Sequence, residues 1–158
     1  MALEIERKFL ASRSVLEQCR FGVSIVQGYL YTDSQNTVRI RRAGERTLFT
    51  WKGRRRGASR TEYEFAMSRG VGDFLLALVQ PGRRLQKTRY RVAHADAVWD
   101  VDVFGGALTG LILAELELTS EDEPVTLPPW VDREVTADPQ YRNSRLAMQA
   151  GKVMPRAA

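Results

Sequence analysis

The first ten residues of the chain read MALEIERKFL. Within this stretch Glu4, Glu6 and Lys8 are spaced two residues apart and alternate with Ile5 and Arg7. Successive side chains of an extended strand point to opposite faces, so the two carboxylates and the amine share one face. The pattern predicts a strand over residues 3–10 with one strongly charged face.

The same spacing recurs along the chain, with mostly apolar or aromatic residues between the charges. The repeats are Arg39 and Arg41, Glu62 and Glu64, Lys87, Arg89 and Arg91, Asp100 and Asp102, and Glu115 and Glu117. Any one pair is typical of a solvated strand face. However, like charges about 7 Å apart repel by roughly 2 kcal/mol at an effective dielectric of about 20. A whole set, with acids beside acids and bases beside bases, favours an enclosed site that holds a polyanion bridged to divalent metal ions.

Composition narrows the class of protein. The length of 158 residues predicts a single domain over residues 1–158, and the net charge of +5 favours an anionic partner. One cysteine, Cys19, excludes an internal disulfide. Since the chain also has only one histidine, His94, any metal must be held by oxygen ligands, which points to Mg²⁺, Mn²⁺ or Ca²⁺. No signal peptide or membrane-length apolar stretch is present, so we expect a cytoplasmic protein without membrane contact.

The pattern predicts eight strands and few helices. The strands are expected over residues 3–10, 24–31, 37–42, 47–52, 60–67, 85–93, 98–104 and 111–119. Helices are expected over residues 71–79 and from an N-cap at Ser144 to Gly151, with a helical start at Asp138-Pro139. The basic loop GRRRGAS follows the fourth strand, and the closing MPRAA should fray.

These elements favour an α+β fold built on an eight-stranded antiparallel β-barrel. Closing the strands into a ring removes the sheet edges, and eight strands leave room inside for side chains or one small ligand. We expect the charged faces to line the interior. The apolar faces should point outward, where helices, loops and the contacts of a homodimer would cover them.

The opening EIERK resembles the E-x-E-x-K signature of the CYTH domain, the triphosphate tunnel metalloenzymes. Further segments match that family in order: QGYL, VRIRR, TWKG, RTEYEF, QKTRYR, WDVDVF, AELEL and REVTADPQYRNSRLA. One short charged motif is weak evidence, but an ordered series at compatible spacings is specific. The resemblance covers residues 4 to about 146.

The resemblance implies a tunnel that binds a triphosphate together with Mg²⁺ or Mn²⁺. The implied metal ligands are Glu4, Glu6, Glu115 and Glu117. Asp100 and Asp102 are either further metal ligands or counter-charges to Arg89 and Arg91. The residues assigned to the phosphates are Lys8, Arg39, Arg41, Lys52, Arg60, Lys87 and Arg89.

Catalytic assignments follow from the same resemblance. Glu62 and Glu64 are candidates for a second metal or for positioning the attacking water. Tyr29 either modulates Lys87 as a catalytic pair or is a wall residue. Residues 54–56, three consecutive arginines, are interpreted as a solvated rim that attracts anions.

The leading hypothesis is metal-dependent hydrolysis of a triphosphate. Inorganic tripolyphosphate is favoured because no nucleoside-reading insertion is evident. Thiamine triphosphate hydrolysis and a class IV-type adenylate cyclase reaction remain alternatives within the same family. A non-enzymatic alternative is a polyphosphate- or RNA-binding module that combines a basic groove with stacking aromatics. The paired acids disfavour a nucleic-acid partner, because they repel a phosphate backbone.

Overall fold

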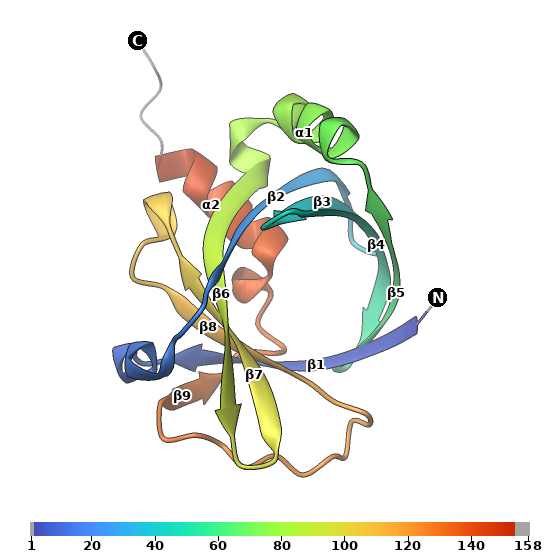
Figure 1. The fold of residues 1–158 in the computed structure, drawn as a ribbon. Helices are drawn as coiled ribbons and strands as arrows, with labels where there is room; N and C mark the ends of the chain where they lie inside the picture. Colours follow the sequence, from blue (N-terminus) through green and yellow to red (C-terminus); the bar gives the residue numbers. More distant parts are fainter. Residues whose placement is uncertain (1, 154–158) are drawn as a thin grey trace.

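The computed structural model describes residues 2–153, so the prediction for MPRAA lies outside the described residues, and a single domain over 1–158 stays a prediction. Nine strands make up one sheet (Figure 1). They are β1 (Ala2–Ala11), β2 (Val23–Thr32), β3 (Thr37–Ala43), β4 (Arg46–Arg56), β5 (Ser59–Met67), β6 (Arg84–His94), β7 (Ala97–Phe104), β8 (Ile112–Glu117) and β9 (Val131–Glu134).

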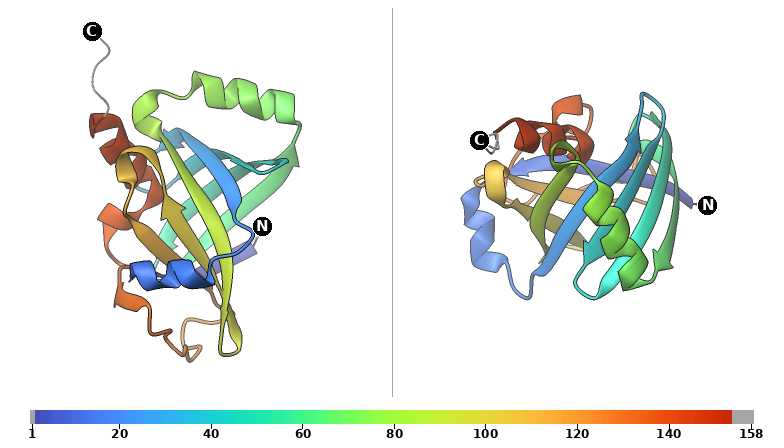
Figure 2. Two further views of the ribbon diagram at one scale, coloured as in Figure 1. Left: turned by 60° about the vertical axis from the view of Figure 1, so that its left-hand side comes forward. Right: turned by 90° about the horizontal axis from the view of Figure 1, so that it is seen from above.

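Eight of these strands close into a ring. The order in the sheet is β5-β4-β3-β2-β6-β7-β8-β1-β9, and a further pairing of β5 with β1 completes the barrel (Figures 1 and 2). All pairings are antiparallel, which confirms the predicted barrel. The ninth strand was not predicted, because it is only four residues long. It pairs with residues 9–11 of β1, beyond residues 2–5, which pair with β5.

The helical segments differ somewhat from the predictions. The helix α1 (Arg69–Leu78) is capped by Ser68, whose hydroxyl accepts from the Val71 amide. The helix α2 (Asn143–Val153) begins one residue before Ser144, so the N-cap prediction there is wrong. Short 3₁₀ turns are η1 (Arg13–Gln18), η2 (Pro81–Arg83), η3 (Gly106–Leu108) and η4 (Pro139–Tyr141). No helix within residues 2–153 has the length and hydropathy needed to cross a membrane.

The outer face of one side of the barrel carries the main apolar core. Phe9 from β1 and Trp99 from β7 meet edge to face, and Trp99 in turn meets Trp130. Val15 from η1 packs on the same cluster. All four side chains are buried, which confirms on this side that the apolar faces point outward beneath turns and loops.

The opposite outer side is more open. The helix α1 packs on β3 and β4, and Gly72 lies directly against Thr47, where a Cβ would overlap that side chain. Beside it Phe49 and Phe65 stack, and Phe65 is exposed. The cover by a homodimer that the sequence suggests stays a prediction.

The interior is charged over only part of its length, which corrects the expectation of a wholly ionic lining. Directly paired residues of neighbouring strands share a face, so Tyr29 opposite Arg39, Leu85 opposite Gln27 and Phe104 opposite Lys87 all face inward. These apolar residues pack against Leu146 and Ala147 of α2. The helix lies behind the ring in Figure 1. The packing of these five residues closes that end of the barrel, and we call them the apolar plug.

Candidate functional site

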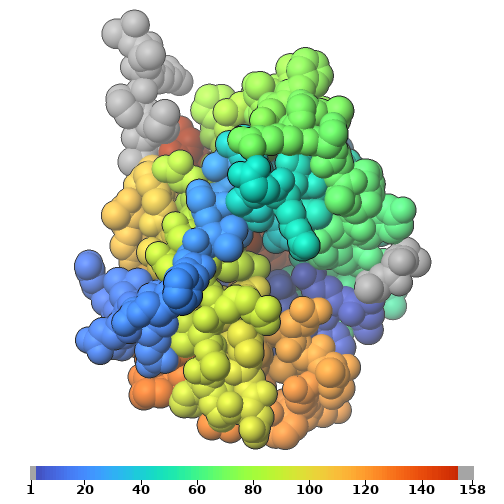
Figure 3. All heavy atoms as spheres, viewed as in Figure 1, coloured from blue at the N-terminus to red at the C-terminus, as the bar shows by residue number. Residues whose placement is uncertain are grey.

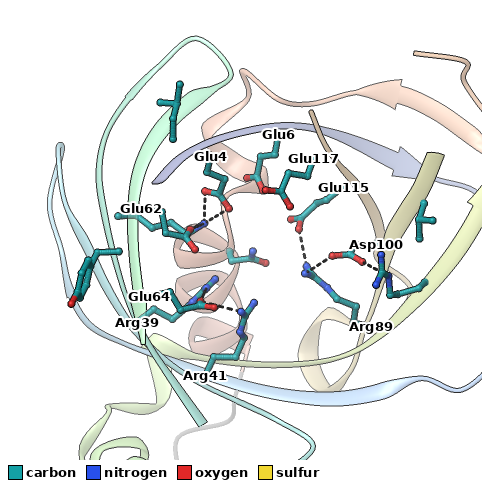
Figure 4. Close-up of a pocket in the computed structure, with 16 residues that line it drawn as sticks. Glu4, Glu6, Arg39, Arg41, Glu62, Glu64, Arg89, Asp100, Glu115 and Glu117 are labelled. Carbon is teal, nitrogen blue, oxygen red and sulfur yellow. Dashed lines mark hydrogen bonds and ion pairs between the residues drawn. The ribbon is translucent and has the colours of Figure 1, made fainter. Parts of the chain in front are cut away.

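The open end of the barrel contains a cavity of about 680 Å³ lined mainly by charged side chains. The surface is hollowed at the centre of the ring (Figure 3). Figure 4 shows the labelled carboxylates and guanidinium groups pointing into one space. The predicted site residues that line it are Glu4, Glu6, Arg39, Arg41, Lys52, Glu62, Glu64, Arg89, Glu115 and Glu117. Alternating side chains on six strands thus converge as the pleat requires.

Carboxylates from β1 and β8 face each other across the pocket wall. Glu6 is directly opposite Glu117, and Lys8 is directly opposite Glu115. Glu117 is exposed and forms no ion pair within residues 2–153. Glu6 is contacted by Arg55, whose Nη2 lies 3.2 Å from its Oε1. Like charges directly opposite one another on a sheet repel, so a cation bound between Glu6 and Glu117 would stabilise this pair.

Two charged groups in the pocket each contact two side chains of the opposite charge. The amine of Lys52 lies 2.6 Å from a carboxylate oxygen of Glu4 and 2.6 Å from one of Glu62. Glu64 lies between two guanidinium groups, 3.2 Å from Arg41 and 3.6 Å from Arg39. These pairs leave each cation and carboxylate close to an alternative partner.

Arg39 and Arg41 retain unused hydrogen-bonding capacity. Thr50 accepts from Arg39 at 3.1 Å and donates to Glu64 at 2.8 Å, which fixes the inner wall of β4. The Nε atoms of Arg39 and Arg41 are buried and have no hydrogen-bond partner among the described residues. Burial lowers the pKa of Arg41, and the neighbouring Arg39 lowers it further. An anion bound beside these two groups would offset their mutual repulsion.

Beneath the pocket, five charged residues form what we call the buried ion-pair cluster. Its members are Lys8, Lys87, Arg89, Asp102 and Glu115. Asp102 is 0% exposed and contacts Lys87 at 2.5 Å and Arg89 at 2.7 Å. It does not line the cavity, so its interpretation as a metal ligand is not supported, and the alternative role of counter-charge fits.

The pKa values of this cluster reflect strong pairing in a dry environment. Burial lowers the pKa of Lys8, but the attractions of Glu115, Glu6 and Asp102, together with the hydrogen bond to Glu115, outweigh it and the net shift is upward. Burial would raise the pKa of Glu115, yet Lys8 and Arg89 hold it well below its usual range. For Lys87 burial prevails over the attraction of Asp102 and lowers the pKa to about 8.

The proposed pairing of Tyr29 with Lys87 is not formed. The Tyr29 hydroxyl accepts from Gln27 at 2.7 Å, and its ring belongs to the apolar plug. Burial raises the pKa of this phenol to about 12. The Lys87 side chain is 1% exposed and points to Asp102, with Asn143 at 3.5 Å. Tyr29 is therefore a wall residue, and Lys87 lies behind the cavity lining.

Two more of the residues assigned to phosphate do not line the cavity. Lys8 is paired with Glu115 at 2.9 Å in the buried ion-pair cluster. Arg60 donates through Nε to the Gly53 carbonyl at 2.8 Å and through Nη2 to the Lys52 carbonyl at 3.4 Å. These carbonyls belong to an irregularity in β4, where the register with β5 shifts between Lys52 and Arg55. Arg60 thus braces the backbone of β4.

The structure also places residues in the site that the motifs did not identify as part of it. Asn143, the first residue of α2, reaches the cavity wall. Arg55 was assigned to a solvated loop, but residues 53–56 belong to β4 and its side chain contacts Glu6. The register shift in β4 is the reason, since it has no signal in the spacing of charges.

The donor set of the pocket fits a hard divalent cation. Glu6 and Glu117 offer opposed carboxylates, and oxygen ligands are those that Mg²⁺ and Mn²⁺ prefer. Within residues 2–153 no three acidic, histidine or cysteine side chains already converge on one point, because Glu4 and Glu115 are each paired with a cation. A metal ion held here would therefore draw carboxylates away from these cations.

The fold and the site together define a class of closed antiparallel β-barrels whose open end holds a pocket lined by both acidic and basic side chains. The family model of the CYTH domain matches residues 2–147. The chain belongs to the CYTH domain family.

Relatives at moderate identity extend this comparison. An inorganic triphosphatase of Acetivibrio thermocellus is 37% identical over 146 residues, which cover 92% of this chain and 94% of the relative. An inorganic triphosphatase of Nitrosomonas europaea is 38% identical over 149 residues, with coverages of 92% and 97%. A crystal structure of the inorganic triphosphatase NE1496 matches with a TM-score of 0.64 at 36% identity and covers 94% of this chain and 96% of its own.

Proposed function

We propose that this protein hydrolyses triphosphates in a metal-dependent reaction, with inorganic tripolyphosphate as the preferred substrate. The observation that carries the proposal is the pocket itself, in which basic side chains face carboxylates inside a closed barrel, and in which Glu117 has no ion-pair partner within residues 2–153. The two relatives at 37% and 38% identity, both named inorganic triphosphatase, support the same reaction.

The cationic wall would bind the substrate. Arg39 and Arg41 line the pocket from β3, and Lys52 adds a point charge from β4. Guanidinium forks match the paired oxygens of a phosphoryl group, and an ammonium group neutralises a single oxygen. Arg89 is held by Asp102 and Glu115 and would contact the substrate with a fixed geometry. These residues would therefore orient the phosphate chain along the pocket.

The acidic wall would supply metal binding and water activation. Glu4, Glu6, Glu115 and Glu117 are the residues that would hold Mg²⁺ or Mn²⁺, which when bound neutralises phosphate oxygens and offsets the charge that develops on the leaving group. Glu64 accepts from Thr50 and lies beside two arginines, so its carboxylate is fixed where it could orient a water molecule. Glu62, beside Lys52, is the second candidate for this role.

The proposal is tested by phosphate release from tripolyphosphate, pyrophosphate, ATP and thiamine triphosphate, each with Mg²⁺ and with Mn²⁺. We expect tripolyphosphate to be hydrolysed fastest, with no release in EDTA. The control is the double variant Glu4→Ala, Glu6→Ala, which loses half of the acidic wall and whose fold is checked by circular dichroism. Equal rates for the control and the wild type would reject the hydrolase, and formation of cyclic AMP and pyrophosphate from ATP would show a cyclase instead.

A further inference from the structure

The irregularity in β4 changes which arginine of the run 54–56 faces the interior. Lys52 lies opposite Glu62 on the inner face, and strict alternation would turn residue 54 inward. The register with β5 shifts after Lys52, and Arg55 then lies directly opposite Arg60. A strand with one extra residue changes the face on which the following side chains lie. Arg54 and Arg56 are accordingly exposed, whereas Arg55 is half-buried.

Arg55 is held in place by its surroundings. Its Nη1 donates to the Ala58 carbonyl at 3.3 Å, and its Nη2 donates to Glu6 at 3.2 Å. The side chains of Arg55 and Glu6 are only 20% and 16% exposed. Burial lowers the pKa of Arg60, and the charge of Arg55 lowers it further, as expected for two guanidinium groups in proximity. Arg60 in turn binds the two carbonyls at the irregularity.

Arg55 is the one cation that the described residues place on Glu6, the carboxylate that faces Glu117. A cation that binds the two carboxylates must compete with this guanidinium for Glu6 and is also repelled by its charge. We propose that Arg55 is a positioning residue that acts through Glu6 to weaken metal binding in the absence of substrate, so that the metal enters mainly with the anionic substrate. The inference rests on the proposed function for the identity of that substrate.

The test measures Mn²⁺ binding to the substrate-free protein by calorimetry, in wild type, Arg55→Gln and Arg54→Gln. The two variants lose the same charge from adjacent positions, and only the first removes the contact with Glu6. We expect Arg55→Gln to bind Mn²⁺ about tenfold more tightly, the scale of one charge-assisted hydrogen bond. Arg54→Gln should stay within about twofold of wild type, since surface charges are screened by salt.

An increase in affinity separates this role from a structural one, because damage to the site would weaken Mn²⁺ binding. Unchanged or weaker binding in Arg55→Gln would overturn the inference, as would the absence of Mn²⁺ binding in both wild type and variant. If Arg55→Gln does not fold, Arg55→Lys decides: it keeps the charge, and a gain above about threefold would contradict a charge-based role.

This binding experiment is independent of turnover. Tight Mn²⁺ binding in Arg55→Gln together with no hydrolysis of tripolyphosphate by wild type would reject the proposed function but keep the role of Arg55. A second measurement connects the two. If wild type is active, the Mn²⁺ concentration at half-maximal rate should fall for Arg55→Gln and remain unchanged for Arg54→Gln.

Discussion

Both ends of the barrel contain acidic and basic side chains. Those at the closed end are paired with one another, and some at the open end are not. In the buried ion-pair cluster at the closed end, Asp102 is 0% exposed and contacts two cations. At the open end, Glu117 is exposed without an ion-pair partner among residues 2–153, and the Nε atoms of Arg39 and Arg41 are unused. The closed end thus has its charges neutralised by the fold, and the open end has charges left to bind a ligand.

The difference shows that inward-facing charge in this protein serves two purposes. Lys87 and Asp102 lie directly above the apolar plug, where an unpaired charge would be too costly to bury. Their pairing anchors Arg89, which reaches from the cluster into the cavity. The buried ion pairs therefore hold the site in place, and the exposed charged groups are available to bind a ligand. Three predictions test this division.

The largest effect is expected from Asp102→Ala. The variant leaves Lys87 buried with no carboxylate at its amine, which should lower the free energy of unfolding by about 3–5 kcal/mol. Chemical denaturation of wild type and variant in metal-free buffer measures this loss. The matched control is Asp73→Ala, which removes a 2.6 Å ion pair with Arg42 on the outer surface and should cost less than about 1 kcal/mol. Similar losses of unfolding free energy in both variants would mean that the buried ion-pair cluster contributes no more to stability than a surface ion pair.

A smaller effect, on activity instead of stability, is expected from Arg41→Ala. Loss of a positioned donor to the phosphates should lower kcat/KM for tripolyphosphate by about a hundredfold. Stability should change by less than about 1 kcal/mol, because the lost contact with Glu64 is offset by relief of the burial of the Arg41 charge and of its repulsion by Arg39. Arg42→Ala is the control, since Arg42 is next in sequence but pairs with Asp73 outside the barrel. A comparable fall in kcat/KM for the control would argue against a site-specific role for Arg41.

The alternation of charges was sufficient to predict which residues share the inner face, but not how deep each one lies. Lys87 and Arg91 are on the same face of β6, yet their side chains are 1% and 76% exposed. Depth depends on where α2 closes the barrel, and that is set by packing of Leu146 and Ala147 on inward-facing apolar residues far away in sequence. For this reason the spacing of charges did not decide between the alternative roles of Tyr29 and of Asp102, nor show that Lys87 lies behind the cavity lining.

The irregularity in the backbone of β4 was the second feature that could not be predicted from the sequence. The pattern correctly placed Lys52 inside, but the register shift that follows it has no signal in the spacing of charges. The glycine at position 53 was a weak signal, since glycine in a strand often marks a bulge. Both arginines therefore differ from their expected positions. Arg55, expected on a solvated rim, contacts a pocket carboxylate, and Arg60, expected at the phosphates, braces the strand.

The smallest of the three effects concerns the pH dependence of stability, and it tests whether the closed end is as dry as its burial suggests. The pKa of Lys87 falls from 10.5 to about 8 on folding because of burial. Between these values the unfolded chain binds more protons than the folded one, so stability should rise with pH. The gain between pH 8 and pH 10 is about 2 kcal/mol for this group. Deprotonated Lys87 leaves Asp102 paired with Arg89, so no carboxylate is left unpaired.

Urea denaturation at pH 8, 9 and 10 of wild type and Lys87→Met measures this dependence. Methionine keeps the stem of the side chain but cannot titrate, so the rise should be absent in the variant, and the difference between the two proteins isolates Lys87. Lys8 serves as an internal contrast, because its net pKa shift is upward and it should stay charged over this range. A rise of equal size in Lys87→Met would assign the titration to another group and would place water, and not a dry ion pair, at the closed end of the barrel.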